Sequence, residues 1–314
     1  MGAVQTTSNG GLPRSMLSRA DALLDAFDGE HLSLTLTGLV ARTGLPKTTV
    51  FRIAEEMTDL GWIERREGRY AIGTKLFEHA SLAGPRTSVR DSALPFLQDL
   101  CAATRETTHL AVIDGNEIIY LEKLVGRRPV TTLSRVGGRM PALCTGLGKV
   151  LTAFSPQDVR EDTIGAGVEA RTPHTLTRPW KIRRELARIR HEGVGYDHEE
   201  CGLGLHCVAA PVTGPDGSCV AAVSVTGPAD RPNVNRVAPL VRHAARQTSH
   251  VLAAVSAART AGNREPRSAC SRPDRWDGVG VGELCPAPRT PLLVEASVRP
   301  RVTVSARPAP RFGC

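Results

Sequence analysis

The chain has 314 residues, enough for two domains with separate hydrophobic cores. It contains no run of about 18 apolar residues, and no basic region followed by a continuous apolar stretch opens it. We therefore expect a cytoplasmic protein without a membrane span. The eight cysteines are scattered and form no dense disulfide framework, so we interpret them as free, mostly buried thiols.

The net charge of +8 does not by itself indicate a nucleic-acid partner, because it is unevenly distributed. Residues 1–84 carry 9 basic and 10 acidic side chains, whereas the segment from residue 259 carries 10 and 5. Any case for DNA binding must therefore depend on where individual basic residues lie.

The N-terminal part of the chain predicts a compact helical unit over residues 16–74, after a polar segment 1–15 that we expect to be disordered. Apolar residues follow helical spacing over 17–27. A short helix follows Thr35, and a third helix opens at Pro46, where a missing N–H costs nothing.

The third helix has two different faces. Short polar and basic side chains on one face, after a tight turn, are typical of the second helix of a helix-turn-helix, which enters the major groove of DNA. The alternative is a plain helical unit that contacts other proteins. The apolar face holds Val50, Ile53, Ala54, Met57 and Leu60, and the polar face holds Lys47, Thr48, Thr49 and Arg52.

A hairpin is expected next, with apolar residues on both sides of a turn at Glu67-Gly68. Its three arginines, Arg65, Arg66 and Arg69, suit a wing that contacts backbone phosphates. Helix, turn, recognition helix and basic hairpin in this order predict a winged helix-turn-helix.

After a linker helix over 75–86, the pattern of residues 87–258 predicts an α+β domain. A helix over 92–104 precedes a hairpin that turns at Gly115-Asn116. Two apolar strands, 207–212 and 219–226, lie between a helix that stops at Gly193 and a long helix over 237–255. Residues 259–314 hold eight prolines and no lysine, and we expect a disordered basic tail, inert or holding DNA nonspecifically.

Several segments resemble the IclR family of bacterial transcriptional regulators, over about residues 17–258. In the N-terminal unit these are Leu45 to Arg52 (LPKTTVFR), the following LGWI and the wing. The other matching segments are GRMPALCTGLGK (138–149), EGVGYDHEE (192–200), CVAAP (207–211) and AVSVTGP (222–228). The resemblance implies a GAF-like effector-binding domain, operator binding by dimers or tetramers, and small carboxylates, such as keto acids and aromatic acids, as effectors.

Carried over residue by residue, the resemblance implies an effector site formed by Gly146, Leu147, Asp197, Cys207, Ser224 and Thr226. The glycines precede the helical run 149–154, so free backbone N–H groups there suit an anion. Each residue also has a plainer interpretation. Without the resemblance, Cys207 before an apolar strand is more typical of a core position than of a ligand site. Asp197 is equally typical of a turn cap, and the two glycines alone match a phosphate loop weakly.

Three other functional classes match single features of the sequence. An enzyme would use His174 or His206 with a thiolate such as Cys207, but neighbouring residues on a strand point to opposite faces. A zinc site at His198, Cys201, His206 and Cys207 lacks the usual short paired spacing. A ligand-binding module without DNA function would leave the basic helix 47–52 unexplained.

The sequence thus predicts a non-enzymatic regulator with no catalytic residue, metal or cofactor. Its expected partners are a double-stranded DNA operator, a small organic acid and further copies of itself, as a homodimer or homotetramer. The sequence does not indicate the effector, the target genes or whether the regulator represses or activates transcription.

Overall fold

The computed structural model describes residues 15–127, 130, 132, 134–230 and 234–262. The segment expected to be a disordered tail lies outside these residues except for the end of one helix, and of the segment 1–15 only Ser15 is described. No helix in the described ranges has the length and apolar character needed to cross a membrane.

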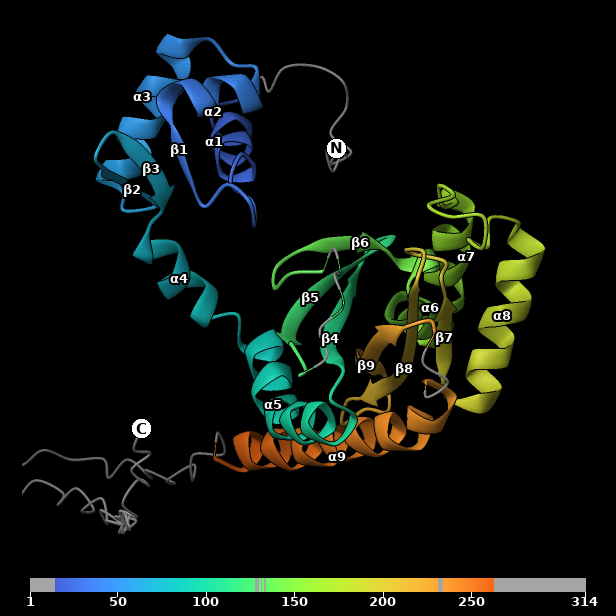
Figure 1. Ribbon diagram of the computed structural model, residues 1–314. Helices are drawn as coiled ribbons and strands as arrows, with labels where there is room; N and C mark the ends of the chain where they lie inside the picture. Colours follow the sequence, from blue (N-terminus) through green and yellow to red (C-terminus); the bar gives the residue numbers. More distant parts are fainter. Residues whose placement is uncertain (1–14, 128–129, 131, 133, 231–233, 263–314) are drawn as a thin grey trace, which may run out of the picture. The chain divides into compact units, whose positions relative to one another are not determined.

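The N-terminal unit combines three helices with a small antiparallel sheet (Figure 1). The helices are α1 (Met16–Asp25), α2 (Leu36–Thr43) and α3 (Lys47–Asp59). The strands are β1 (Ser33–Thr35), β2 (Ile63–Arg66) and β3 (Arg69–Ile72), in the order β1-β3-β2. Their buried side chains meet in one core that includes Leu23, Leu39, Ile53, Ile63 and Tyr70.

Local signals explain where these elements begin and end. The Thr35 side chain caps α2 by accepting the Gly38 N–H at 3.1 Å, and Gly44 ends the helix at φ 68°. Pro46 is the N-cap of α3 rather than its first residue. Strand β1 was not expected from the sequence: at three residues it is too short to show a period, and it forms only by pairing with β3.

Two helices follow the wing: α4 (Thr74–Ser81) and α5 (Gly84–Thr104). Gly84 and Pro85 begin α5, whereas the sequence placed them at the end of the linker helix. A proline is tolerated in the first turn of a helix, where its missing N–H would have no partner. The helix expected over 92–104 is therefore the C-terminal part of α5.

The C-terminal domain is built on a six-stranded antiparallel sheet in the order β6-β5-β4-β9-β8-β7. The expected hairpin is β4 (Thr107–Asp114) and β5 (Glu117–Leu124). The two expected apolar strands are β8 (Leu205–Thr213) and β9 (Cys219–Pro228). The edge strands β6 (Arg139–Pro141) and β7 (Gly195–His198) are short and were not predicted.

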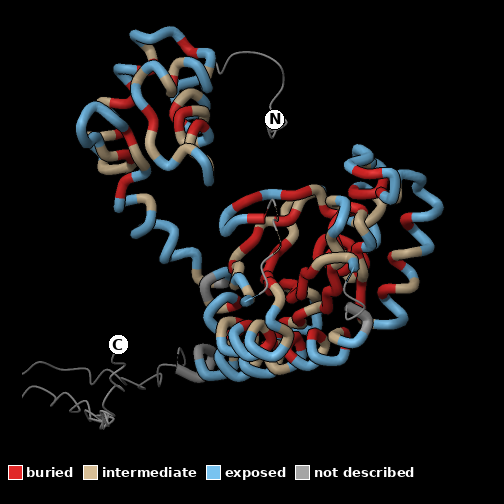
Figure 2. The backbone as a smooth tube through the Cα atoms, viewed as in Figure 1, coloured by how far each residue is buried: buried red, intermediate tan, exposed pale blue. Residues whose placement is uncertain are grey.

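Helices cover both faces of this sheet, and buried residues line both (Figures 1 and 2). Helices α5 and α9 (Val234–Gly262) pack on one face against large side chains such as Leu110, Val208 and Val223. The other face carries Ala111, Ala209 and Ala222, and it packs against α6 (Gly146–Phe154), which α8 (Pro179–Glu192) covers. Because side chains alternate between the two faces of a strand, one face carries large side chains and the other carries alanines at these positions. We call the face with Ala111, Ala209 and Ala222 the shallow face. The short helix η1 (Ala142–Cys144) leads into α6, and α7 (Gln157–Ala166) follows it.

A substitution at Gly148 can test how closely α6 packs on η1, the short helix before it. A Cβ atom at this position would lie 2.2 Å from the Ala142 carbonyl oxygen and 2.4 Å from its Cα. Because that contact is backbone and cannot rotate away, we expect Gly148→Ala to lower the free energy of unfolding by about 1–3 kcal/mol or more. Urea denaturation followed by circular dichroism measures this change.

The matched control is Gly165→Ala in α7, where an added Cβ meets no atom within 4 Å. Alanine favours helix over glycine, so this variant should be unchanged or more stable by about 0.5–1 kcal/mol. Equal stability of the two variants would mean that α6 does not depend on this close approach.

Candidate functional site

The four polar residues predicted on the recognition helix lie at the start of α3. Lys47, Thr48 and Arg52 are exposed, whereas Thr49 is half-buried and donates its N–H to the Pro46 carbonyl oxygen at 2.9 Å. Within the described residues, no ion pair or hydrogen bond engages the Lys47 ammonium or the Arg52 guanidinium. Their charges are therefore available to an outside partner.

The three arginines of the wing have different surroundings. The hairpin turns at Glu67 (φ 51°) and Gly68 (φ 75°), two left-handed residues that suit a two-residue loop. Arg66 is highly exposed, with 80% of its side chain accessible, and its partner among the described residues is Glu64 at 2.8 Å. Arg65 lies over the Tyr70 ring at 5.5 Å, 3.4 Å from the Glu55 carboxylate.

Arg69 has a structural role that the sequence did not reveal. Its guanidinium donates to the Ser33 hydroxyl at 2.9 Å and to the Ser33 carbonyl oxygen at 2.6 Å. It thereby joins β1 to the wing. A phosphate contact by Arg69 would have to share a guanidinium that already holds two hydrogen bonds.

In the C-terminal domain, four of the six predicted effector residues lie in two rows across the shallow face of the sheet. Directly paired residues of neighbouring strands share a face. One row runs Asp197, Cys207, Thr226 and Thr107 over β7, β8, β9 and β4. The next row includes Ser224 of β9 and its partner His109 of β4. Asp197, Cys207, Ser224 and Thr226 are thus brought together, although they are distant in sequence.

The start of α6 lies over this face. Thr145 caps the helix by accepting the Gly148 N–H at 3.0 Å, which leaves the Gly146 and Leu147 N–H groups without a hydrogen bond among the described residues. A Cβ atom on Gly146 would be 3.2 Å from the Cys207 sulfur. Two free donors at the positive end of a helix therefore lie close above Cys207.

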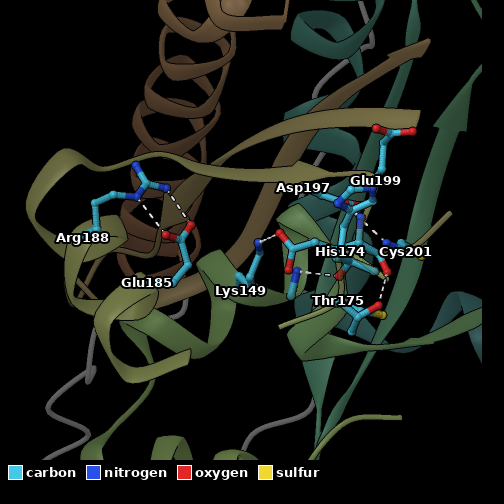
Figure 3. Close-up of polar contacts among 12 residues, drawn as sticks. Lys149, His174, Thr175, Glu185, Arg188, Asp197, Glu199 and Cys201 are labelled. Atoms are coloured by element: carbon cyan, nitrogen blue, oxygen red, sulfur yellow. Dashed lines mark hydrogen bonds and ion pairs between the residues drawn. The ribbon is translucent and has the colours of Figure 1, made fainter. Parts of the chain in front are cut away.

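A buried ion pair joins α6 to the loop after β7. The Lys149 ammonium pairs with the Glu200 carboxylate, and both residues are almost completely buried. Figure 3 shows Lys149 between the Glu185–Arg188 pair and the turn at Asp197. Losing either partner would leave an uncompensated buried charge, so this pair fixes the loop relative to the helix.

Asp197 has the turn-capping role that the sequence offered as one of two interpretations. Its Oδ1 accepts the Glu200 N–H at 2.7 Å, so it caps the turn after β7. Burial raises the pKa of its carboxyl group to about 7, against the lowering effect of the Lys149 charge. Near neutral pH this group is therefore close to its midpoint between neutral and charged forms.

The Cys207 thiol is neutral at physiological pH, because burial and the Asp197 charge raise its pKa to about 12. This argues against the thiolate nucleophile of the enzyme alternative. His198 and His206 are paired neighbours whose rings lie 5.0 Å apart, on the sheet face opposite Cys207. The four residues of the zinc alternative therefore do not converge.

Sequence reasoning missed Thr107 and His109 as site residues. Both are buried on β4, directly beside Thr226 and Ser224. The signal was present, because polar residues at 107 and 109 precede Ala111 with the period of two expected for one strand face. Only the strand order placed them beside the predicted residues.

Comparison with known proteins gives matches over both domains. Residues 16–67 match the IclR helix-turn-helix domain, and residues 83–250 match the bacterial transcriptional regulator IclR C-terminal domain. The regulator XynR of Escherichia coli is 32% identical over 213 residues, which are 67% of this chain and 84% of XynR. The transcriptional repressor IclR of the same organism is 30% identical over 226 residues, 70% and 82% of the two chains.

Solved structures agree with this relationship. An IclR homologue from Microbacterium hydrocarbonoxydans, in complex with 4-hydroxybenzoate, is 30% identical with a TM-score of 0.72, covering 76% of this chain and all of that one. The Thermotoga maritima IclR is 28% identical with a TM-score of 0.63, covering 76% of this chain and 98% of that one.

Asp197 makes the stability of the domain depend on pH. The folded protein holds the proton up to a pKa of about 7, whereas the unfolded chain releases it near the ordinary value of 3.8. Stability contributed by the protonated group is thus full below pH 4 and is lost as the pH rises to 7. Asp197→Asn keeps the oxygen that accepts the capping hydrogen bond but cannot ionise. The free energy of unfolding of this variant, relative to the unaltered protein, should therefore rise between pH 4 and 7 and then level off.

Urea denaturation at several pH values measures both proteins. Asp216→Asn is the control, because Asp216 is an exposed turn residue whose pKa is lowered by its hydrogen bonds to Ser218. A constant difference in the free energy of unfolding between Asp197→Asn and the unaltered protein across this range would show that folding does not raise the pKa of Asp197.

Proposed function

The chain belongs to the IclR family of bacterial transcriptional regulators, and we propose that a small organic acid, bound on the shallow face of its C-terminal sheet, controls its binding to an operator. The observation that carries this proposal is the pair of free N–H groups at the start of α6 above Cys207. Proteins so named act on transcription rather than as enzymes.

The DNA-binding part of the proposal uses the exposed residues of α3 and the wing. Lys47, Thr48, Thr49 and Arg52 would enter the major groove, while Arg65, Arg66 and Arg69 would lie along phosphates. The Arg66 side chain is 80% accessible, whereas the Arg69 guanidinium already donates two hydrogen bonds to Ser33. We therefore expect Arg66 to contribute more to affinity than Arg69.

A second copy of the chain is also part of the proposal. One recognition helix reads only a few base pairs, so specificity requires two half-sites about one or more helical turns apart. A homodimer, or a tetramer of two such pairs, meets this requirement. We propose repression as the mode of action, in line with the related repressor of Escherichia coli.

The effector proposal depends on the chemistry of the six residues. Gly146 and Leu147 would donate backbone N–H groups to a carboxylate, with Ser224 and Thr226 adding hydroxyl donors. Cys207 would form a neutral floor, and Asp197 would take up a proton when the anion binds, because two adjacent negative charges repel each other. The complex of the Microbacterium relative with 4-hydroxybenzoate supports an aromatic carboxylate as the ligand class.

The regulatory link follows from thermodynamics. An effector shifts operator binding only by its difference in affinity for the competent and incompetent states. A ligand under the start of α6 contacts β7, β8 and β9 at once, so it can favour one arrangement of α6 on the sheet.

The recognition helix is tested by Lys47→Ala and Arg52→Ala. Both side chains are exposed, so the fold should be kept while operator affinity falls by about tenfold or more for Arg52→Ala. For Lys47→Ala, the slope of log affinity against log salt should fall by about one unit. Gel shifts on an operator selected from random duplexes measure both effects.

Lys181→Ala is the matched control, because it removes one exposed positive charge from α8. Unchanged affinity in both α3 variants would contradict the interface, as would an equal loss in the control.

The effector site is tested by Ser224→Ala, with calorimetry against benzoate, hydroxybenzoates and pyruvate. The loss of one hydrogen bond to a charged group is worth about 1.5–3 kcal/mol, so affinity should fall about ten- to a hundredfold while operator affinity stays unchanged. Ser218→Ala, in the exposed turn before β9, should bind as the unaltered protein does. Undiminished binding by Ser224→Ala would place the effector elsewhere.

A further inference from the structure

Three buried polar atoms next to the proposed effector site have no partner among the described residues. They are the Thr107 hydroxyl, the Nδ1 atom of His109 and the Ser224 hydroxyl, which has the weakly bonding Cys207 thiol as a neighbour. Their residues are 1%, 2% and 0% exposed. Buried polar groups are nearly always paired in folded proteins, so three unpaired ones together indicate a place where a ligand supplies the missing bonds.

These atoms share one face and adjoin one another. Thr107 and His109 lie two residues apart on β4, and His109 is directly paired with Ser224 on β9. The His109 ring also lies 5.2 Å from the Tyr120 ring. The cluster is therefore a polar patch with an aromatic wall beside it.

A chain of hydrogen bonds determines which His109 nitrogen carries the proton. Lys123 can only donate, and its ammonium donates to the Thr132 hydroxyl at 2.8 Å. The Thr132 hydroxyl is 2.8 Å from the Ser134 hydroxyl, which is 2.8 Å from Nε2 of His109. With each hydroxyl accepting from the group nearer the cation and donating to the next, Ser134 donates to Nε2 of His109. The proton of the neutral ring is then on Nδ1, which is an N–H donor.

The ring itself is neutral. Burial, together with the Lys123 charge, lowers the pKa of His109 to about 3. A neutral ring cannot balance a second carboxylate, so this patch suits an uncharged group. A hydroxyl suits it best, because it accepts from the Nδ1 N–H and donates to the oxygen of Thr107.

The patch lies across the sheet from the free N–H groups of α6. Those groups lie above Cys207 of β8, whereas His109 is on β4, and β9 separates the two strands. Strands β8 and β4 are therefore two strand spacings apart, or about 10 Å. Side chains that extend into this space from both ends leave a gap of about the length of one substituted ring.

We propose that His109 binds the effector, donating its Nδ1 proton to an uncharged hydroxyl or carbonyl oxygen at the end of the ligand opposite the carboxylate. The effector is then a monocarboxylate with a second polar group, of which a hydroxy-substituted aromatic acid is the simplest example. This inference rests on the proposed carboxylate site at α6, and it adds the residue that selects the far end of the ligand.

The test compares 4-hydroxybenzoate, 3-hydroxybenzoate and benzoate by calorimetry. The unaltered protein should bind one hydroxybenzoate at least about tenfold more tightly than benzoate. His109→Leu should remove this preference and leave benzoate affinity within about threefold. His109→Asn places an amide N–H near the position of Nδ1, so it should restore part of the preference.

The outcomes separate this inference from the proposed function. If benzoate and both hydroxybenzoates bind equally, or if His109→Leu keeps the preference, the role of His109 is wrong while the carboxylate site stands. If pyruvate binds the unaltered protein and none of the three aromatic acids does, the role of His109 is wrong while the carboxylate site stands. If pyruvate does not bind either, both proposals are wrong.

A second measurement observes the His109 ring in the unaltered protein. Nitrogen-15 NMR of the histidine-labelled, unaltered protein at pH 7 should give one neutral ring with the proton on Nδ1, insensitive to acidification down to pH 5. The signal is assigned by its absence from His109→Asn. A His109 ring protonated on Nε2, or one that titrates near pH 6.5, would overturn the proposal.

Discussion

The close approach of helix α6 to the shallow face of the sheet is the constraint on which the effector site depends. A Cβ atom on Gly148 or Gly195 would overlap a neighbouring residue, and one on Gly146 would press on the Cys207 sulfur. Ala209 and Ala222 on the strands keep the opposing surface low. Small side chains on both sides thus bring backbone N–H groups to within ligand distance of a sheet, where larger residues would hold the helix away.

Around this contact, charged residues lie at the edge of the proposed effector site, whereas the groups inside it are neutral or nearly so. The charge of Lys149 acts on Asp197, but Glu200 already pairs with this lysine, and the pair holds the loop that carries Asp197. Inside, the Cys207 thiol and the His109 ring are neutral, and Asp197 is close to its own midpoint. An anion would therefore meet dipoles and hydroxyls rather than a fixed positive side chain, which makes its recognition depend on geometry.

In the N-terminal unit, the arginines have different roles. Arg52 projects from α3 without a partner in the described ranges, while Arg69 joins the wing to β1. Arg65 is intermediate, resting on Tyr70. A basic hairpin is therefore both a surface for phosphate and a structural brace, and counting its arginines overestimates the charge available to a partner.

The sequence alone predicted much of this protein, because several signals are local. Helical period and caps located α2, α3 and α8, and Gly115-Asn116 located the β4–β5 turn. Family motifs indicated Asp197, Cys207, Ser224 and Thr226, which the sheet does bring together. Strands β1, β6 and β7 were missed, because strands of three or four residues show no period and form only against a partner.

Tertiary structure alone decided what surrounds each predicted residue. Strand order placed Thr107 and His109 beside Thr226 and Ser224, and no local pattern reveals which strand lies next to β9. The partner of Lys149 and the brace made by Arg69 likewise arise from contacts 51 and 36 residues apart in the chain. Periodicity determines which face of an element is buried, whereas pairing across the fold determines what that face meets, and the chemistry of the site is set by the second of these.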